Sequence, residues 1–126
     1  MRAVDTNVLV RLVVRDNAKQ ASAAEAFVGD GAWVSVLALA EATWVLSSVY
    51  ELDSRRIANA VAMLLEHRQL TLQDSDVVAS ALARFRAKPT LGFSDCLMLA
   101  LAVKAGHVPL GTFDRNLAKI EGAIGI

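Results

Sequence analysis

The fold of this chain is indicated first by residues 2–15, which read RAVDTNVLVRLVVR. The pattern predicts a short strand over Arg2–Val4 that ends at Asp5, and then a helix over Val8–Arg15. An acidic residue therefore stands where a strand ends, just before a helix. The same order of strand and helix recurs along the rest of the chain.

Strand-like and helix-like segments alternate from this start onward. Further strands are predicted at Ala32–Val34, Leu70–Leu72 and Val108–Leu110, with a small edge strand at Ala123–Ile126. Helices are expected to start at the capping residues Asp16, Ser35, Asp53, Asp74 and Ser94, and a short basic helix is expected after Asp114. This alternation predicts an α/β fold, a parallel sheet covered by helices on both faces.

Composition limits the class of protein. A chain of 126 residues has the usual size of one domain, and we expect residues 1–126 to form one. Its hydrophobic fraction of 55% and charged fraction of 21% exclude disorder, and the apolar excess suggests a dimer or a bound partner. Zero net charge argues against a protein that holds nucleic acid by bulk charge. The single cysteine, Cys96, favours a reducing compartment, so we expect a cytoplasmic protein with no membrane span.

Four acidic residues lack the ordinary explanation of a helix cap or a solvated surface. Asp5 ends an apolar strand, and Asp114 follows the predicted strand Val108–Leu110. Glu41 interrupts a long apolar helix, and Asp95 is the one charged residue between Lys88 and Lys104. Burying an unpaired carboxylate costs several kcal/mol or forces it to hold a proton. These four positions therefore call for a shared cause.

A metal site supplies that cause. Functional residues of an open parallel sheet collect at the carboxyl ends of its strands. Clustered carboxylates repel one another and need cations, and all-oxygen ligands favour Mg²⁺ or Mn²⁺ over zinc. Each acid also has a structural alternative: Asp5 and Asp114 as caps, Glu41 in an ion pair with an arginine, and Asp95 as a first-turn acid.

The same positions carry a family resemblance. Residues 3–9, AVDTNVL, resemble the opening motif of PIN-domain nucleases. Glu41 within LAEATWVL, Asp95 within FSDCL and Asp114 within TFDR are similar to the three later acidic motifs of that family. The resemblance covers essentially the whole chain, with the motifs in order. Within the family, the chain looks most like the VapC-type toxins of prokaryotic toxin–antitoxin pairs.

The resemblance implies a Rossmann-like three-layer α/β/α sandwich and a Mg²⁺- or Mn²⁺-dependent endoribonuclease, a homodimer inhibited by a cognate antitoxin. By motif, Asp5, Asp95 and Asp114 would be the main metal ligands, and Glu41 would bind directly or through water. Asn7 and Thr112 would orient the acids. Ser94 stands where alanine is common in the family.

Cations near the motifs are candidates for binding the RNA substrate. Arg11 and Arg15 lie one helical turn apart, and so do Arg115 and Lys119. Solvated helix faces are the alternative for both pairs. Two other functions compete with the nuclease: a catalytically silent binding module of the same fold, and a phospho-acceptor signalling domain. The second usually needs a lysine beside the site, and no lysine follows a predicted strand.

Overall fold

The computed structural model describes all residues, 1–126, and divides them into two compact units, Met1–Ser75 and Asp76–Ile126. The units are called unit 1 and unit 2, and each is described by itself. The single domain that the sequence predicts over residues 1–126 stays a prediction.

Unit 1 is built on three parallel strands in the order β1-β2-β3. They are β1 (Arg2–Val4), β2 (Ala32–Val34) and β3 (Leu70–Leu72), and they match the predicted strands residue for residue. Val4 pairs with Val34, and Val34 pairs with Leu72, so the three strands end level with one another. Residues that directly follow these strands therefore share one edge of the sheet.

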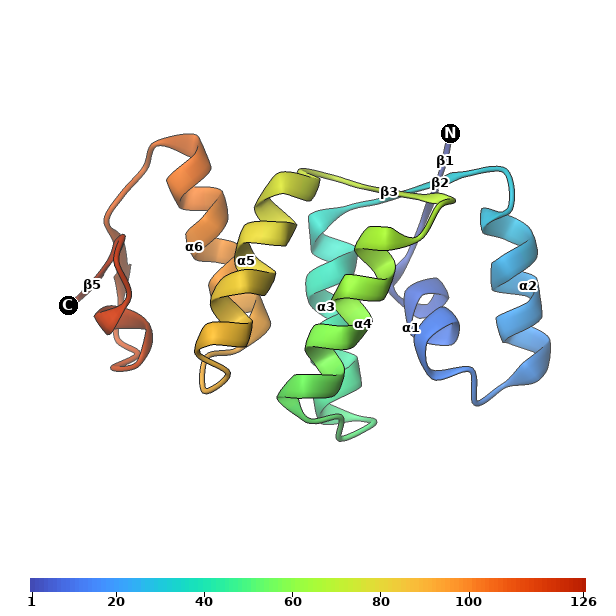
Figure 1. Cartoon of the computed structure of the whole chain (residues 1–126), viewed down its shortest axis with the longest axis horizontal. Helices are drawn as coiled ribbons and strands as arrows, with labels where there is room; N and C mark the ends of the chain where they lie inside the picture. The colour runs from blue at the N-terminus through green and yellow to red at the C-terminus, as the bar shows by residue number, and fades with distance from the viewer. The chain divides into compact units, whose positions relative to one another are not determined.

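Four helices complete unit 1, and in the view of Figure 1 they lie below β2 and β3. They are α1 (Thr6–Val14), α2 (Ala18–Val28), α3 (Val36–Ser48) and α4 (Ser54–Glu66). Side-chain caps define all four starts, because Asp5, Asn17, Ser35 and Asp53 each accept a hydrogen bond from the backbone N–H three residues later. α1 packs against both α2 and α3 through fully buried residues such as Leu9 and Val10.

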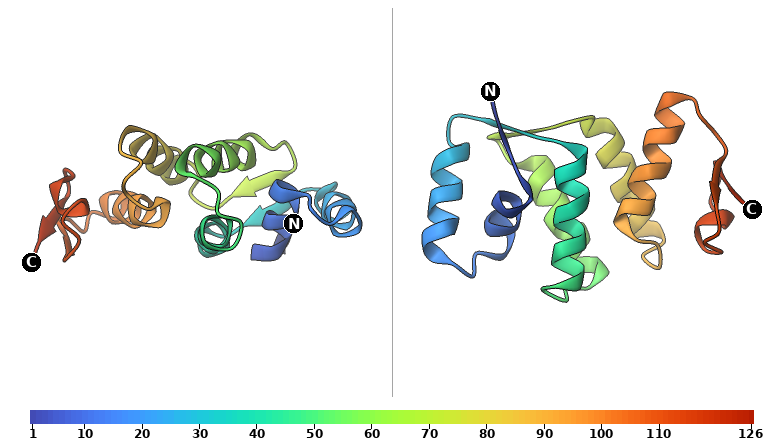
Figure 2. Two further views of the ribbon diagram at one scale, coloured as in Figure 1. Left: turned by 90° about the horizontal axis from the view of Figure 1, so that it is seen from below. Right: turned by 180° about the vertical axis from the view of Figure 1, so that it is seen from behind.

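Unit 2 contains two helices, a short 3₁₀ helix and a two-stranded parallel sheet. The elements are α5 (Ser75–Ala87), which begins at the boundary, α6 (Phe93–Ala105), β4 (Leu110–Thr112), η1 (Leu117–Lys119) and β5 (Ala123–Gly125). Phe85 of α5 and Phe93 of α6 meet edge to face, with ring centroids 5.8 Å apart. Cys96 lies in the apolar interior at 1% exposure. Two views of the chain show these elements from other sides (Figure 2).

The structure confirms the α/β class and the parallel strands, and it corrects three local predictions. α2 is capped by Asn17, because Asp16 instead forms an ion pair with Arg11 at 2.6 Å. α6 begins at Phe93, so Ser94 lies inside its first turn and does not cap it. The fourth strand is Leu110–Thr112 and not Val108–Leu110, since Pro109 has no N–H to donate to a strand ladder.

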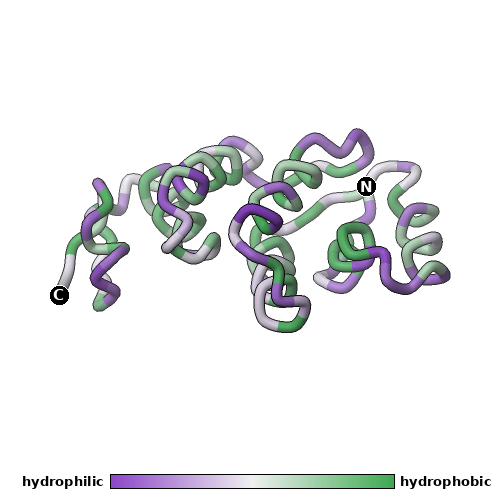
Figure 3. The backbone as a smooth tube through the Cα atoms, turned by 60° about the horizontal axis from the view of Figure 1, so that its bottom comes forward, coloured by the Kyte–Doolittle hydropathy of each residue, from purple (hydrophilic) through white to green (hydrophobic).

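The long apolar stretch from Ala32 to Tyr50 is divided by the fold. Its first residues form β2, Ser35 caps the next helix, and the remainder forms α3. None of the helices combines the length and hydrophobicity needed to cross a bilayer. Figure 3 shows that hydrophobic residues recur along the helices, while many hydrophilic residues fall in the connections.

Candidate active site

Asp5 stands at the carboxyl end of β1 and is the N-cap of α1. Its Oδ1 accepts a hydrogen bond from the backbone N–H of Val8 at 3.3 Å, and its side chain is exposed. Asp5 therefore does cap the first helix, as the structural alternative for this residue predicted. A cap uses one lone pair of one oxygen, so the carboxylate keeps most of its capacity to accept further partners.

Glu41 lies near the same edge because α3 follows directly after β2. The Thr6 hydroxyl donates a hydrogen bond to Glu41 Oε2 at 2.8 Å. Since Thr6 is the neighbour of Asp5, this bond brings the carboxylate of α3 beside the end of β1. No arginine forms an ion pair with Glu41, which was the structural alternative for this residue. Its partner is the Thr6 hydroxyl.

The contact between Thr6 and Glu41 is one that the sequence does not predict. A threonine at the start of a helix has no pattern of its own. The signal that could have found it is the hydroxyl one position after the acid, on a helix expected to pack near another acid.

Asp95 and Asp114 belong to unit 2. Asp95 lies in the first turn of α6 and is partly buried, and Asp114 is exposed after β4. Asp114 Oδ1 accepts hydrogen bonds from the backbone N–H groups of Asn116 at 2.8 Å and Leu117 at 2.9 Å. Asp114 thus orders the turn that leads into η1, although the N-cap of η1 is Asn116.

The two acids of unit 2 affect each other electrostatically. Burial raises the pKa of the Asp95 carboxyl, and the negative charge of Asp114 raises this pKa further. Two like charges placed in this way disfavour the ionised form of Asp95. A cation between them would remove that penalty, and carboxylate oxygens are the ligands that Mg²⁺ and Mn²⁺ prefer. The donor chemistry of the acids thus fits a hard divalent ion.

The raised pKa of Asp95 leads to a stability prediction. The protonated side chain stabilises the fold below the ordinary pKa of 3.8, and this contribution is lost as pH rises through the raised folded-state pKa. Asp95→Asn is neutral at every pH and escapes the loss. We expect the variant to unfold at a higher urea concentration than the parent at neutral pH in EDTA, and the difference to vanish in acid.

Asp76 provides the matched control for this measurement. The hydrogen bond from Lys104 lowers the pKa of Asp76, so its ionised form is favoured in the folded chain. Asp76→Asn should therefore bring no gain in stability at neutral pH. An Asp95→Asn variant that is no more stable than its parent would contradict the unfavourable environment described for Asp95.

The acids divide evenly between the units, Asp5 and Glu41 in unit 1 and Asp95 and Asp114 in unit 2. No set of three or more His, Cys, Asp or Glu side chains is gathered as a ready metal site in either unit. Neither unit by itself contains all four acids.

The predicted supporting residues have different surroundings. Thr112 Oγ1 accepts a hydrogen bond from the backbone N–H of Asp114 at 3.0 Å, which fixes the turn that carries this acid. Asn7 is exposed on the first turn of α1 and lines a pocket beside it.

The basic side chains that are predicted to bind the substrate differ in whether they are already paired with an acid. Arg11 pairs with Asp16 at 2.6 Å, and Arg15 pairs with Glu25 at 2.7 Å. Arg115 and Lys119 are exposed in unit 2 beside Asp114 and form no ion pair. The second pair is the one whose charge is free to meet a phosphate.

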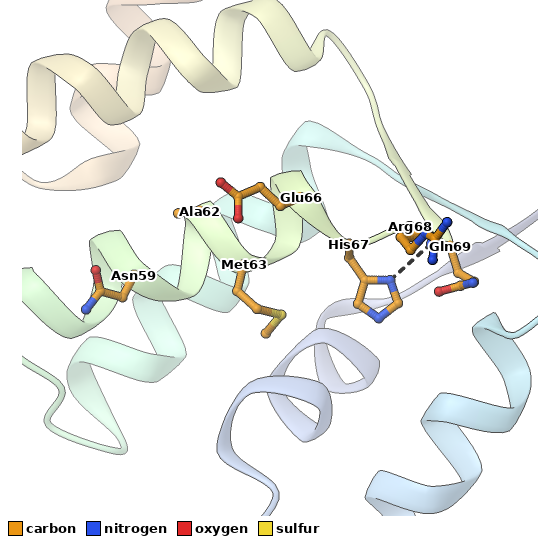
Figure 4. Close-up of a pocket in the computed structure, with 7 residues that line it drawn as sticks. All are labelled: Asn59, Ala62, Met63, Glu66, His67, Arg68 and Gln69. Carbon is orange, nitrogen blue, oxygen red and sulfur yellow. Dashed lines mark hydrogen bonds between the residues drawn. The ribbon is translucent and has the colours of Figure 1, made fainter.

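Another pocket, of about 510 Å³, lies where α4 ends and β3 begins. Figure 4 shows the side chains that line it, among them His67, whose Nδ1 accepts a hydrogen bond from the backbone N–H of Gln69 at 3.2 Å. Because β1 and β3 lie in one parallel sheet, this pocket is at the amino end of the strands, whereas Asp5 is at the carboxyl end. It therefore takes no part in the acidic site.

Comparison with family models gives one match, to the PIN domain, over residues 2–123. The chain belongs to the PIN domain family. Membership confirms the predicted fold class and agrees with the α/β elements and parallel strands of the structure. Comparisons with curated proteins and with solved structures gave no significant match.

PIN domains are typically metal-dependent nucleases and commonly bind Mg²⁺ or Mn²⁺. In this PIN domain the four acids fall at the positions that resemble the family motifs. Two of them also have a structural role, because Asp5 caps α1 and Asp114 orders the turn before η1.

Proposed function

We propose that this PIN domain is a metal-dependent endoribonuclease that hydrolyses RNA phosphodiester bonds, with Mg²⁺ or Mn²⁺ as its cofactor. Asp5, Glu41, Asp95 and Asp114 act together as its acidic site. The observation that carries the proposal is the match to the PIN domain family over residues 2–123, with acids at the four positions that resemble the family's motifs. The partly buried Asp95 supports it, because a bound cation would offset the unfavourable effect of burial and of the Asp114 charge on the ionised form of Asp95.

Each side chain has a distinct task in this proposal. Asp5, Asp95 and Asp114 would supply carboxylate oxygens to the ion, and Glu41, oriented by Thr6, would bind it directly or through water. Bound metal supplies polarisation of a phosphoryl oxygen and a lowered pKa of the attacking water. Arg115 and Lys119 hold the phosphate chain from unit 2.

The biological role is inferred from the resemblance of the motifs to those of VapC-type toxins. We propose a toxin of a toxin–antitoxin pair, acting in the cytoplasm as a homodimer and inhibited by an antitoxin. The apolar excess of the sequence supports an extended contact with a second copy or a partner, and the lone buried Cys96 is compatible with a reducing compartment.

A silent PIN-fold binding module is the second candidate, and one observation favours it. Because Asp5 and Asp114 cap backbone turns, a protein without activity would still have reason to keep them. Capping does not account for Glu41 or Asp95. A phospho-acceptor domain is less well supported, since Lys104 and Lys119 lie on helices and not at strand ends.

The test is cleavage of a mixed cellular RNA pool by the purified chain with Mg²⁺ or Mn²⁺, against EDTA and against Asp95→Asn. Discrete fragments that require both metal and Asp95 support the nuclease, and their ends identify the cut site. Intact RNA from folded, metal-loaded, partner-free protein favours the silent module. Transfer of phosphate onto one aspartate would favour signalling.

Thr6 offers a prediction about the orientation of Glu41. Thr6→Val keeps the shape of the side chain but removes the hydroxyl that donates to Glu41 Oε2. Residues that orient metal ligands are typically worth about 10–100-fold in activity or metal affinity, so we expect a loss near the lower end for this exposed bond. Thr6→Ser keeps the donor and should retain most of the activity. Equal cleavage rates and equal metal affinities for the two variants would remove Thr6 from the site.

A further inference from the structure

A pocket of about 400 Å³ opens between α1 and α2 in unit 1, two helices that are neighbours in Figure 1. Its apolar wall is formed by Val8, Ala23, Ala24 and Phe27, and its polar groups come from Asn7, Arg11 and Gln20. Pockets that hold small ligands are typically about 300–1,000 Å³, mostly apolar, with a few placed polar groups. This pocket has that character.

The pocket begins next to Asp5. The backbone N–H of Val8, which lines the pocket, donates a hydrogen bond to Asp5 Oδ1 at 3.3 Å. Asn7, which stands between Asp5 and Val8 in the sequence, also lines the pocket. A nucleic acid strand with a phosphate at Asp5 therefore has a neighbouring nucleotide within reach of the pocket.

The walls are fixed before any ligand arrives. The guanidinium of Arg2 lies over the Phe27 ring, 3.8 Å from its centroid, and donates to the Phe27 carbonyl oxygen at 3.0 Å. On the other side, Arg11 donates to Asp16 Oδ1 at 2.6 Å and to the Tyr50 hydroxyl at 2.7 Å. Preformed walls spare a ligand the entropy of ordering them.

The chemistry of the lining selects an uncharged, flat group. Asp16 neutralises the charge of Arg11, so the pocket does not offer a free cation to a phosphate. Asn7 and Gln20 carry amides, each with donors and an acceptor, and such groups pair with the edges of bases. Phe27 adds an aromatic ring, one face of which is covered by the Arg2 guanidinium. Unpaired bases of single-stranded RNA bind aromatic rings by stacking and bind polar groups through hydrogen bonds at their edges.

We propose that the pocket between α1 and α2 receives an unpaired base of the RNA, in the nucleotide beside the bond that is cut. The inference rests on the proposed function and deepens it, because a base pocket next to Asp5 gives the nuclease a preference for sequence around its cut site.

Filling the pocket tests this directly. Ala23→Trp places a large side chain on an exposed position that lines the pocket. The matched control is Ser22→Trp, an exposed position on the same helix that does not line it. Binding of short fluorescein-labelled single strands, oligo(A), oligo(C), oligo(G) and oligo(U), is followed by anisotropy in EDTA, where hydrolysis does not interfere. Cut sites in a mixed RNA pool are mapped separately with Mg²⁺.

Loss of one stacked base should weaken binding of the preferred strand by about fivefold or more in Ala23→Trp, and the control should bind like the parent. The nucleotide preferred beside the cut should change in Ala23→Trp alone. Parental affinity and parental cut sites in Ala23→Trp would overturn the base pocket while leaving the nuclease intact. A parent that neither binds nor cuts RNA would overturn both, and the pocket would then be a contact for a protein partner.

Discussion

Replacing Asp5 with asparagine is expected to abolish cleavage while leaving the fold intact. Asparagine caps helices as well as aspartate does, so the bond from the Val8 N–H is kept. The amide carries no negative charge and is a poorer ligand than a carboxylate for the Mg²⁺ of the proposed site. Because outer-shell groups alone are worth about 10–100-fold, loss of a direct ligand should reduce metal-dependent cleavage by more than about 100-fold. Fragment yield from the RNA pool measures the effect.

Asp5→Ala separates the two roles of this side chain. It removes both the charge and the cap, and the lost cap should cost about 1 kcal/mol of unfolding free energy. Urea denaturation should therefore rank the parent and Asp5→Asn together, with Asp5→Ala less stable. An Asp5→Asn variant that cleaves like the parent would reduce Asp5 to a helix cap and favour the silent module.

Leu9→Ala is expected to have the largest effect on stability. Leu9 is 0% exposed on α1, the helix that packs against both α2 and α3. Removing a fully buried leucine side chain typically costs about 2–5 kcal/mol, a large part of the roughly 5–15 kcal/mol that holds a domain folded. The midpoint of urea unfolding should fall strongly, with an unchanged slope if the unfolded state is the same.

Lys19→Ala provides the control for the core variant. Lys19 is exposed on α2, and surface changes of this kind usually alter stability by less than about 0.5 kcal/mol. If Leu9→Ala unfolds at the same urea concentration as Lys19→Ala, the packing of α1 described here is wrong.

Much of the fold could be predicted because its signals are local. Strands β1, β2 and β3 are short, mostly apolar segments, each followed by a polar residue, and α3 and α4 follow good capping residues, Ser35 and Asp53. The errors arose where contacts from elsewhere decided the outcome. Asp16 is as good a cap as Asn17 by its own chemistry, but Arg11 engages it.

The sequence singles out the four candidate acids but not the groups that they contact. Asp5, Glu41, Asp95 and Asp114 stand out because charge in an apolar context is rare. The bond between Thr6 and Glu41 joins residues 35 positions apart, and no periodicity reports such a contact. The pocket between α1 and α2 was equally hidden, because it exists only when the two helices pack.

The burial of the single thiol should protect it from oxidation. Cys96 is the neighbour of Asp95 along the chain, yet it is 1% exposed, and burial raises the pKa of its thiol. Oxidation proceeds through an accessible thiolate, and Cys96 offers neither the access nor the ionised sulfur. Peroxide that modifies proteins with exposed thiols should therefore leave Cys96 unmodified.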